Sequence, residues 1–149
     1  MKTYIYLCLA TAVLIAASGV STQAQSRNLQ RLVVEIPFTF NAGNKQLPAG
    51  EYNVQIVNPA SDRSVLLIKS SDGKSSALLG TTDVIGLSTA NAKLIFRRYD
   101  SRYFLAQVWM ASESNGMSAP DSKTEKSLRK QLGITNQKED LVAVNARWK

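Results

Sequence analysis

The stretch VVEIPFTF at residues 33–40, followed by LPAGEY at 47–52, decides the fold. Apolar side chains recur at every second position from Leu32 to Phe40, a period that is typical of a strand with one buried face. Pro37 belongs to the outward-facing set, so the apolar face continues past it, although a proline suits only a sheet edge or a bulge. A corner at residues 48–50 then leads into a second alternating strand at 52–57.

The rest of the chain contains further strand signals separated by turns. Short apolar runs predict strands at 65–69 and 75–82, joined by Asp72-Gly73, which is typical of a type I′ hairpin. Residues 83–91 read as a short strand or a loop. A long aromatic hairpin is predicted from 93–99 and 102–110 around Asp100-Ser101, and a terminal strand at about 140–147.

One helix is predicted at about residues 122–132. Ser122 and Glu125 have the spacing of a capping box, in which each side chain bonds a backbone amide of the other residue. Leu128 and Leu132 lie four apart and form one apolar stripe, which we expect to face the edge of the sheet. Gly133 suits the position just after the helix end.

These signals predict an all-β, mainly antiparallel protein with one α-helix in its C-terminal half. Strands separated by turns every 8–12 residues favour a single-domain β-sandwich or small barrel of about seven to eight strands, spanning residues 25–149. No internal repeat or linker divides that range.

The N-terminus reads as a secretory signal peptide, residues 1–24. A positive start at Met1-Lys2 precedes an apolar run at residues 4–17, and Thr22-Gln23-Ala24 suits signal peptidase. The run is shorter than the roughly 20 residues of a membrane-spanning helix, which disfavours an anchor. Cys8 lies inside the run rather than after it, which disfavours a lipoprotein. We therefore expect an exported protein, periplasmic or extracellular.

Histidine is absent from the chain, and Cys8 is its only cysteine. The predicted mature chain therefore has no Ser-His-Asp or Cys-His arrangement, no usual zinc site and no disulfide. These absences favour a protein that is not an enzyme and needs no cofactor, although catalysis by carboxylates alone stays open. Cleavage removes Lys2 and lowers the net charge from +7 to +6, which suits an anionic partner as well as simple solubility.

The two opening motifs resemble those of a group of small secreted bacterial proteins of unknown function. The similarity continues through LIFRRY at 94–99, YFLAQVW at 103–109 and the lysine-rich segment that follows. This resemblance implies a signal peptide and a compact β-rich domain, and it implies no activity, cofactor or catalytic residue.

The long hairpin is the first candidate binding site. Its arginines and tyrosines could present guanidinium and aromatic faces to a polyanion. Consecutive strand residues point to opposite faces, however, which argues against one continuous patch. Lys69, Lys74 and Lys93 could extend the patch if their strands lie beside the hairpin. The candidate contacts are Arg97, Arg98, Arg102, Tyr99 and Tyr103.

Two other sites stay open. Paired carboxylates could hydrolyse a glycan, although most of the acidic residues lie in turns, where Asp is favoured by local hydrogen bonding. The aromatic residues could line a cavity for a small apolar ligand, or simply fill a core. The carboxylate candidates are Glu35, Glu51, Asp62, Asp72, Asp83, Asp100 and Glu113, and the cavity candidates are Phe38, Phe40, Tyr52, Phe96, Phe104, Trp109 and Trp148.

The leading hypothesis is a non-enzymatic envelope or extracellular module that acts by binding or by structural association. Its partner is unknown; an anionic envelope component or polysaccharide fits the charge, and no specific nucleic-acid signal is present. The alternatives are a soluble carrier of a small apolar ligand in a barrel cavity and, less favoured, a carboxylate-based glycan hydrolase.

Overall fold

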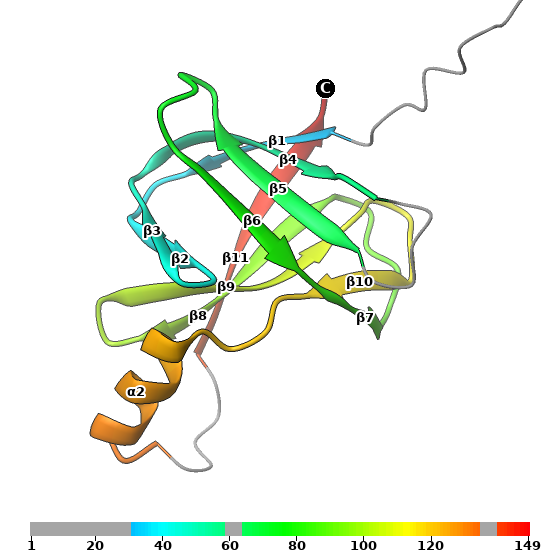
Figure 1. Ribbon diagram of the computed structural model, residues 1–149. Helices are drawn as coiled ribbons and strands as arrows, with labels where there is room; N and C mark the ends of the chain where they lie inside the picture. The colour runs from blue at the N-terminus through cyan, green and yellow to red at the C-terminus, as the bar shows by residue number, and fades with distance from the viewer. Residues whose placement is uncertain (1–30, 59–63, 135–139) are drawn as a thin grey trace, which may run out of the picture.

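The computed structural model describes residues 31–58, 64–134 and 140–149, which form a nearly closed, barrel-like mixed sheet with one helix (Figure 1). The predicted all-β class with a single helix is confirmed. The elements are β1 (Arg31–Ile36), β2 (Phe40–Ala42), β3 (Lys45–Leu47), β4 (Gly50–Ile56), β5 (Val65–Ser70), β6 (Ser76–Gly80), β7 (Thr82–Ile85), β8 (Lys93–Tyr99), β9 (Arg102–Trp109), β10 (Asn115–Ser118), α2 (Lys123–Gln131) and β11 (Asp140–Trp148). The predicted signal peptide lies outside the described residues.

The described strands number eleven, more than the seven or eight expected, because four of them are only three or four residues long. The sheet runs in the order β3-β2-β9-β8-β11-β1-β4-β5-β6. β6 is followed after one residue by β7, which pairs with β10, and β10 pairs with β9. The strands β7 and β10 thus connect β6, at one end of the strand order, with β9, near the other end, which gives the barrel-like shape.

Pro37 ends the first strand. The continuous strand expected through Phe40 was wrong, because β1 stops at Ile36 and β2 begins only after three intervening residues. β1 pairs with β4 and β11, whereas β2 pairs with β3 and, in parallel, with β9. A proline lacks the N–H that a ladder requires, so the chain changes partners there. The apolar face nevertheless stays inside, since Ile36 and Phe40 are both fully buried.

The barrel interior is filled by side chains from nearly every strand. Phe40 packs edge-on against Tyr52 and Phe96, with ring centroids 5.3 and 5.4 Å apart. Such edge-to-face contacts are favourable beyond the apolar area that they bury. The other fully or nearly fully buried members include Leu32, Val34, Ile36, Leu47, Val54, Leu66, Ile68, Leu94, Leu105, Val108 and Met110.

The β5–β6 turn differs from the prediction. A type I′ turn needs positive φ at both central residues, but of the two only Gly73 has it, at +75°. The amide of Gly73 donates to the carbonyl of Ser70 and the amide of Ser70 to that of Ser75, which makes a four-residue loop. The carboxylate of Asp72 holds this loop by accepting from the Ser70 hydroxyl and the Lys74 amide.

β10 was not expected, because Asn115-Gly116 resembles a turn. The glycine is needed by the side chain of Trp109, which lies against the backbone of Gly86 and Gly116. A Cβ atom at Gly116 would lie 2.7 Å from the indole ring, and one at Gly86 only 2.4 Å away. The indole N–H donates to Oε1 of Gln107 at 2.9 Å. Two glycines therefore make room for one tryptophan on the outside of the barrel.

In the described part of the chain, no helix has both the length and the apolar character needed to cross a membrane.

Candidate functional site

Helix α2 is attached to the outer side of β8 by a buried ion pair. Nε of Arg97 lies 2.6 Å from Oε1 of Glu125, and the second guanidinium contact reaches Oε2 at 3.3 Å. The Tyr99 hydroxyl donates to the same Oε1 at 3.1 Å. Glu125 is 1% exposed, and Tyr99 and Arg97 are nearly as buried. A buried charge requires such partners, because desolvation is otherwise costly.

A second carboxylate extends this network to the surface. Asp121, which precedes α2, accepts from Arg97 at 2.9 Å and from Arg129, one turn beyond Glu125 on α2, at 3.1 Å. Burial alone would lower the pKa of Arg97, but the bond to Glu125 and the charges of Glu125 and Asp121 raise it above its ordinary value. Burial, and then Glu125, raises the pKa of Tyr99 to about 12. Arg97 therefore stays charged and Tyr99 stays protonated at neutral pH.

The ends of α2 have the expected caps, with one difference. The Ser122 hydroxyl accepts from the amide of Glu125 at 3.0 Å, and Gly133 takes a positive φ just after the helix. The Ile134 amide donates to the Arg129 carbonyl, which completes a Schellman motif. The Glu125 carboxylate bonds Arg97 and Tyr99, however, so the reciprocal half of the capping box was a wrong assignment.

The apolar stripe was also wrongly expected to be the buried face of the helix. Leu132 is 48% exposed and Leu128 is half-buried, while Glu125 is the buried residue of α2. The helix is thus docked by polar contacts to the strand below it, with Leu128 as a partly buried apolar contribution.

The five residues predicted to contact a polyanion fall into separate environments. Arg97 and Tyr99 lie beneath α2. Arg98 faces the other side of the strand, where it is exposed and pairs with Asp140 across from β11. Tyr103 lies opposite Arg98 and stacks on Phe38 with ring centroids 3.9 Å apart. Arg102 is exposed beside the turn. The structure therefore brings Arg98 together with Tyr103, and it separates both of them from Arg97 and Tyr99.

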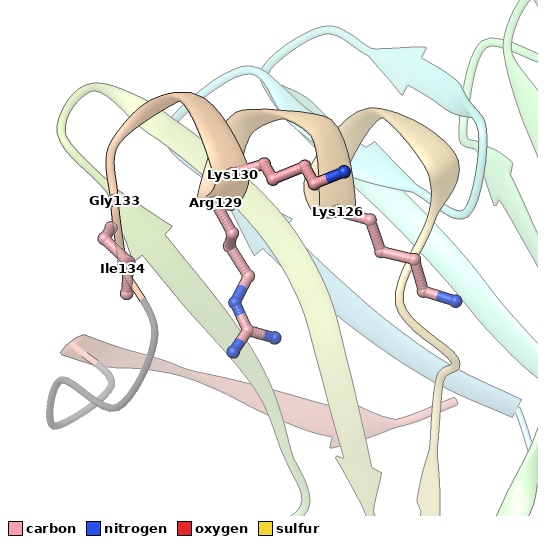
Figure 2. Close-up of a pocket in the computed structure, with 5 residues that line it drawn as sticks. All are labelled: Lys126, Arg129, Lys130, Gly133 and Ile134. Atoms are coloured by element: carbon pink, nitrogen blue, oxygen red, sulfur yellow. The ribbon is translucent and has the colours of Figure 1, made fainter.

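The exposed charges of α2 are all positive, because Glu125 is its one acidic residue and is buried. We call Lys123, Lys126, Arg129 and Lys130 the α2 cationic face. Lys126, Arg129 and Lys130 line a pocket of about 350 Å³ with Gly133 and Ile134 (Figure 2). Figure 2 shows Lys126 and Arg129 leaving the helix on the same side, while Lys130 extends along it. Arg129 is anchored by Asp121, and the three lysines are exposed.

The helix macrodipole does not account for this arrangement. Cations in the last turn, such as Arg129 and Lys130, stabilise a helix, whereas cations in the first turn oppose its dipole. Lys123 is the first residue of α2 and Lys126 follows one turn later. Helix stability therefore gives no reason for a positive charge at Lys123.

No two of the carboxylate candidates that the structure describes form a buried acid–base pair. Glu35 and Glu51 do lie opposite each other on β1 and β4. Glu35 is exposed, however, and Glu51 is engaged by the Ser71 hydroxyl at 2.6 Å and by Arg147 at 3.2 Å. A glycosidase acid normally depends on an apolar pocket that raises its pKa. The remaining described candidates, Asp72, Asp83, Asp100 and Glu113, are exposed, and Asp62 lies outside the described residues.

The aromatic candidates do not share one cavity. Phe40 contacts both Tyr52 and Phe96 inside the barrel, and Phe38 packs against Phe96 and Tyr103. The other three lie outside this cluster: Phe104 packs against Tyr99 beneath α2, Trp109 covers Gly116, and Trp148 is 44% exposed. The rings thus act as packing on both sides of the sheet.

A second pocket, of about 280 Å³, lies beside the Pro48–Gly50 corner. Glu51 and Asp72 line it, so its charge is opposite to that of the α2 pocket. The Tyr52 hydroxyl donates to the Pro48 carbonyl at 2.7 Å there, and burial, then the charge of Asp72, raises its pKa. Across the described ranges, no group of three or more acidic side chains is arranged to hold a metal ion.

Comparison with family models, with curated proteins and with solved structures finds no match to this chain.

Sequence reasoning noted the lysine-rich helix without assigning it a role. Sequence reasoning missed the pairing of Glu125 with Arg97. This pairing buries the one acidic side chain of α2, so the charged side chains that α2 exposes to solvent are all cations. A glutamate three residues after a serine was attributed to capping, and an arginine in an aromatic strand to ligand contact.

Proposed function

We propose that this protein is an exported, non-enzymatic β-domain that binds an anionic polysaccharide of the cell envelope through the α2 cationic face. The observation that carries the proposal is the burial of Glu125. It removes the negative charge of α2 from the surface and leaves four cations on a helix of nine residues and its pocket.

The spacing of these cations suits an extended polymer. Lys123, Lys126 and Lys130 follow one another at about one-turn intervals, roughly 5 Å along the helix. Two of them, with Arg129, surround the pocket, where a carboxylate or phosphate group would be held by several donors. Binding of this kind is mainly electrostatic, so it weakens as salt screens the charges.

The test uses immobilised polygalacturonate, a carboxylated polysaccharide, with neutral dextran as the reference surface. We expect the protein to bind the acidic polymer and not dextran, with an affinity that falls steadily from about 0.05 to 0.5 M salt. The variant Lys123→Gln/Lys126→Gln/Lys130→Gln should bind at least about tenfold more weakly at low salt.

The matched control removes three exposed lysines away from α2, Lys69→Gln/Lys74→Gln/Lys149→Gln. It has the same net charge as the test variant and should retain binding within about threefold. Equal losses in both triple variants would show a general charge effect and contradict the site. Arg98→Gln/Arg102→Gln tests the β8–β9 hairpin separately, and a loss confined to this variant would move the site there.

A further inference from the structure

Strand β6 has one paired edge and one free edge. It pairs with β5 along its whole length, from Lys69↔Ser76 to Val65↔Gly80. Among the strands that the structure describes, none pairs with its other side. Figure 1 shows β6 in the front wall of the barrel, beside β5, where it continues into β7.

The ladder determines which backbone groups are free. The amide of Ser70 donates to the Ser75 carbonyl, and that of Thr81 donates to the Ser64 carbonyl. Antiparallel strands alternate between residues that bond the neighbour and residues that point away from it. Ser75, Ala77 and Leu79 therefore bond β5. The N–H and C=O groups of Ser76, Leu78 and Gly80 point to the free edge.

This edge lacks the features that usually prevent strand pairing. Natural edge strands carry lysines, prolines or bulges, or are covered by another segment. Residues 75–82 contain no charge and no proline. The β2–β3 hairpin comes close to β6, and its Gly43 packs against the inward-facing, buried Leu79. Leu78 on the outer face is 66% exposed.

We propose that two copies of this protein associate by antiparallel pairing of their β6 strands around a two-fold axis at Leu78. In this register the Leu78 residues of the two copies face each other, and Ser76 of each copy faces Gly80 of the other. All of these residues direct their backbone groups to the free edge. The three facing pairs are therefore of the hydrogen-bonded type and exchange about six hydrogen bonds.

The edge of β6 is suited to pair with a second copy of itself, because the outward-facing residues before and after Leu78, Ser76 and Gly80, are both small. A two-fold interface requires that the same patch fits itself. Here the only large outward side chain of β6 lies at the centre, beside the half-buried Leu67 of β5, and a small residue flanks it on each side. The pairing places no charge opposite a like charge, which would oppose association.

Disulfide trapping tests the register. In a hydrogen-bonded antiparallel pair the Cα atoms are about 5.5 Å apart, within the range of a disulfide. The Leu78→Cys variant is made in a Cys8→Ser background, so that the introduced thiol is the only one in the chain. The purified variant should oxidise to a covalent dimer. The control is Leu141→Cys on β11, where the leucine is 53% exposed. We expect at least about tenfold slower cross-linking for the control.

Sedimentation of the unmodified chain provides the second measurement. The chain should dimerise between about 1 and 100 μM, as is ordinary for a small interface. Leu78→Lys should weaken the dimer at least about tenfold, because it places two like charges opposite each other. Leu141→Lys should leave the dimer unchanged. A chain that stays monomeric over this concentration range overturns the proposal, even if β6 binds a different polypeptide. A Leu78→Cys variant that cross-links no faster than Leu141→Cys also overturns it.

Discussion

The carboxylate of Glu125 on α2 accepts a hydrogen bond from Nε of Arg97 at 2.6 Å, and Glu125 is fully buried. This pair joins the only described helix to the barrel. It also determines which charges the helix presents outside. One interaction thus governs both the docking of α2 and the sign of its exposed surface.

Breaking this pair from one side should destabilise the protein strongly. Glu125→Leu leaves the Arg97 guanidinium buried with only Asp121 as a charged partner, and we expect a loss of about 3–5 kcal/mol in urea unfolding. Arg97→Met/Glu125→Leu removes both charges and should recover most of that loss. Arg98→Ala, which breaks the exposed pair with Asp140, should cost far less than Glu125→Leu, because solvent screens that pair. A double variant no more stable than Glu125→Leu would contradict this account.

Tyr99 should ionise later than an ordinary tyrosine. Its pKa is raised to about 12 in the folded protein, against about 10 in an unfolded chain. The protonated form is therefore favoured by folding, so this contribution to stability is complete below pH 10 and is lost as the pH rises towards 12. Absorbance at 295 nm should show a late tyrosinate component that Tyr99→Phe removes. An unchanged titration curve in that variant would refute the assignment.

Trp109 should be sensitive to the two glycines beneath it. Gly116→Ala and Gly86→Ala each place a methyl group within 3 Å of the indole ring and should cost about 1–3 kcal/mol. Tryptophan fluorescence should shift as the ring is displaced. The matched control is Gly80→Ala, where the space is open and φ is not positive, and it should be neutral or slightly stabilising. Equal effects at all three positions would show that the contact with Trp109 is unimportant.

Phe40 and Phe38 should differ, although they belong to one sequence pattern. Phe40 is fully buried between Tyr52 and Phe96, so Phe40→Ala should cost about 3–5 kcal/mol in thermal or urea unfolding. Phe38 is only half-buried against Tyr103, and Phe38→Ala should cost clearly less. If both variants unfold like the parent, the register of β1 and β2 is wrong.

The alternating residues of the opening stretch were sufficient to predict an apolar face, because period two follows directly from strand geometry. They could not show that Pro37 moves the chain to a new partner, since pairing depends on which distant strand lies alongside. The all-β class follows from local patterns of this kind. The connection from β7 through β10 to β9 could not be predicted from local patterns, because β10 is short and contains the glycine that Trp109 requires.

The candidate site was predictable only in part. Arg97 and Arg98 are adjacent, and strand alternation already implied that they face opposite ways. Which face would be covered by the helix depends on a contact over 28 residues, between Arg97 and Glu125. No local pattern distinguishes a capping glutamate from one that pairs with a distant arginine. The cationic character of α2 was visible in the sequence, but the burial of its one glutamate required the structure.

The placement of β1 between β4 and β11 has a consequence for when the barrel can form. Leu32 pairs with Trp148, so the two ends of the domain are neighbours in the sheet. Pairings of such long sequence separation are slow to form. A chain emerging from the ribosome, or threaded through a translocation pore, cannot complete its barrel until its last residues are free. The topology thus delays closure of the barrel until β11 is free to pair with β1.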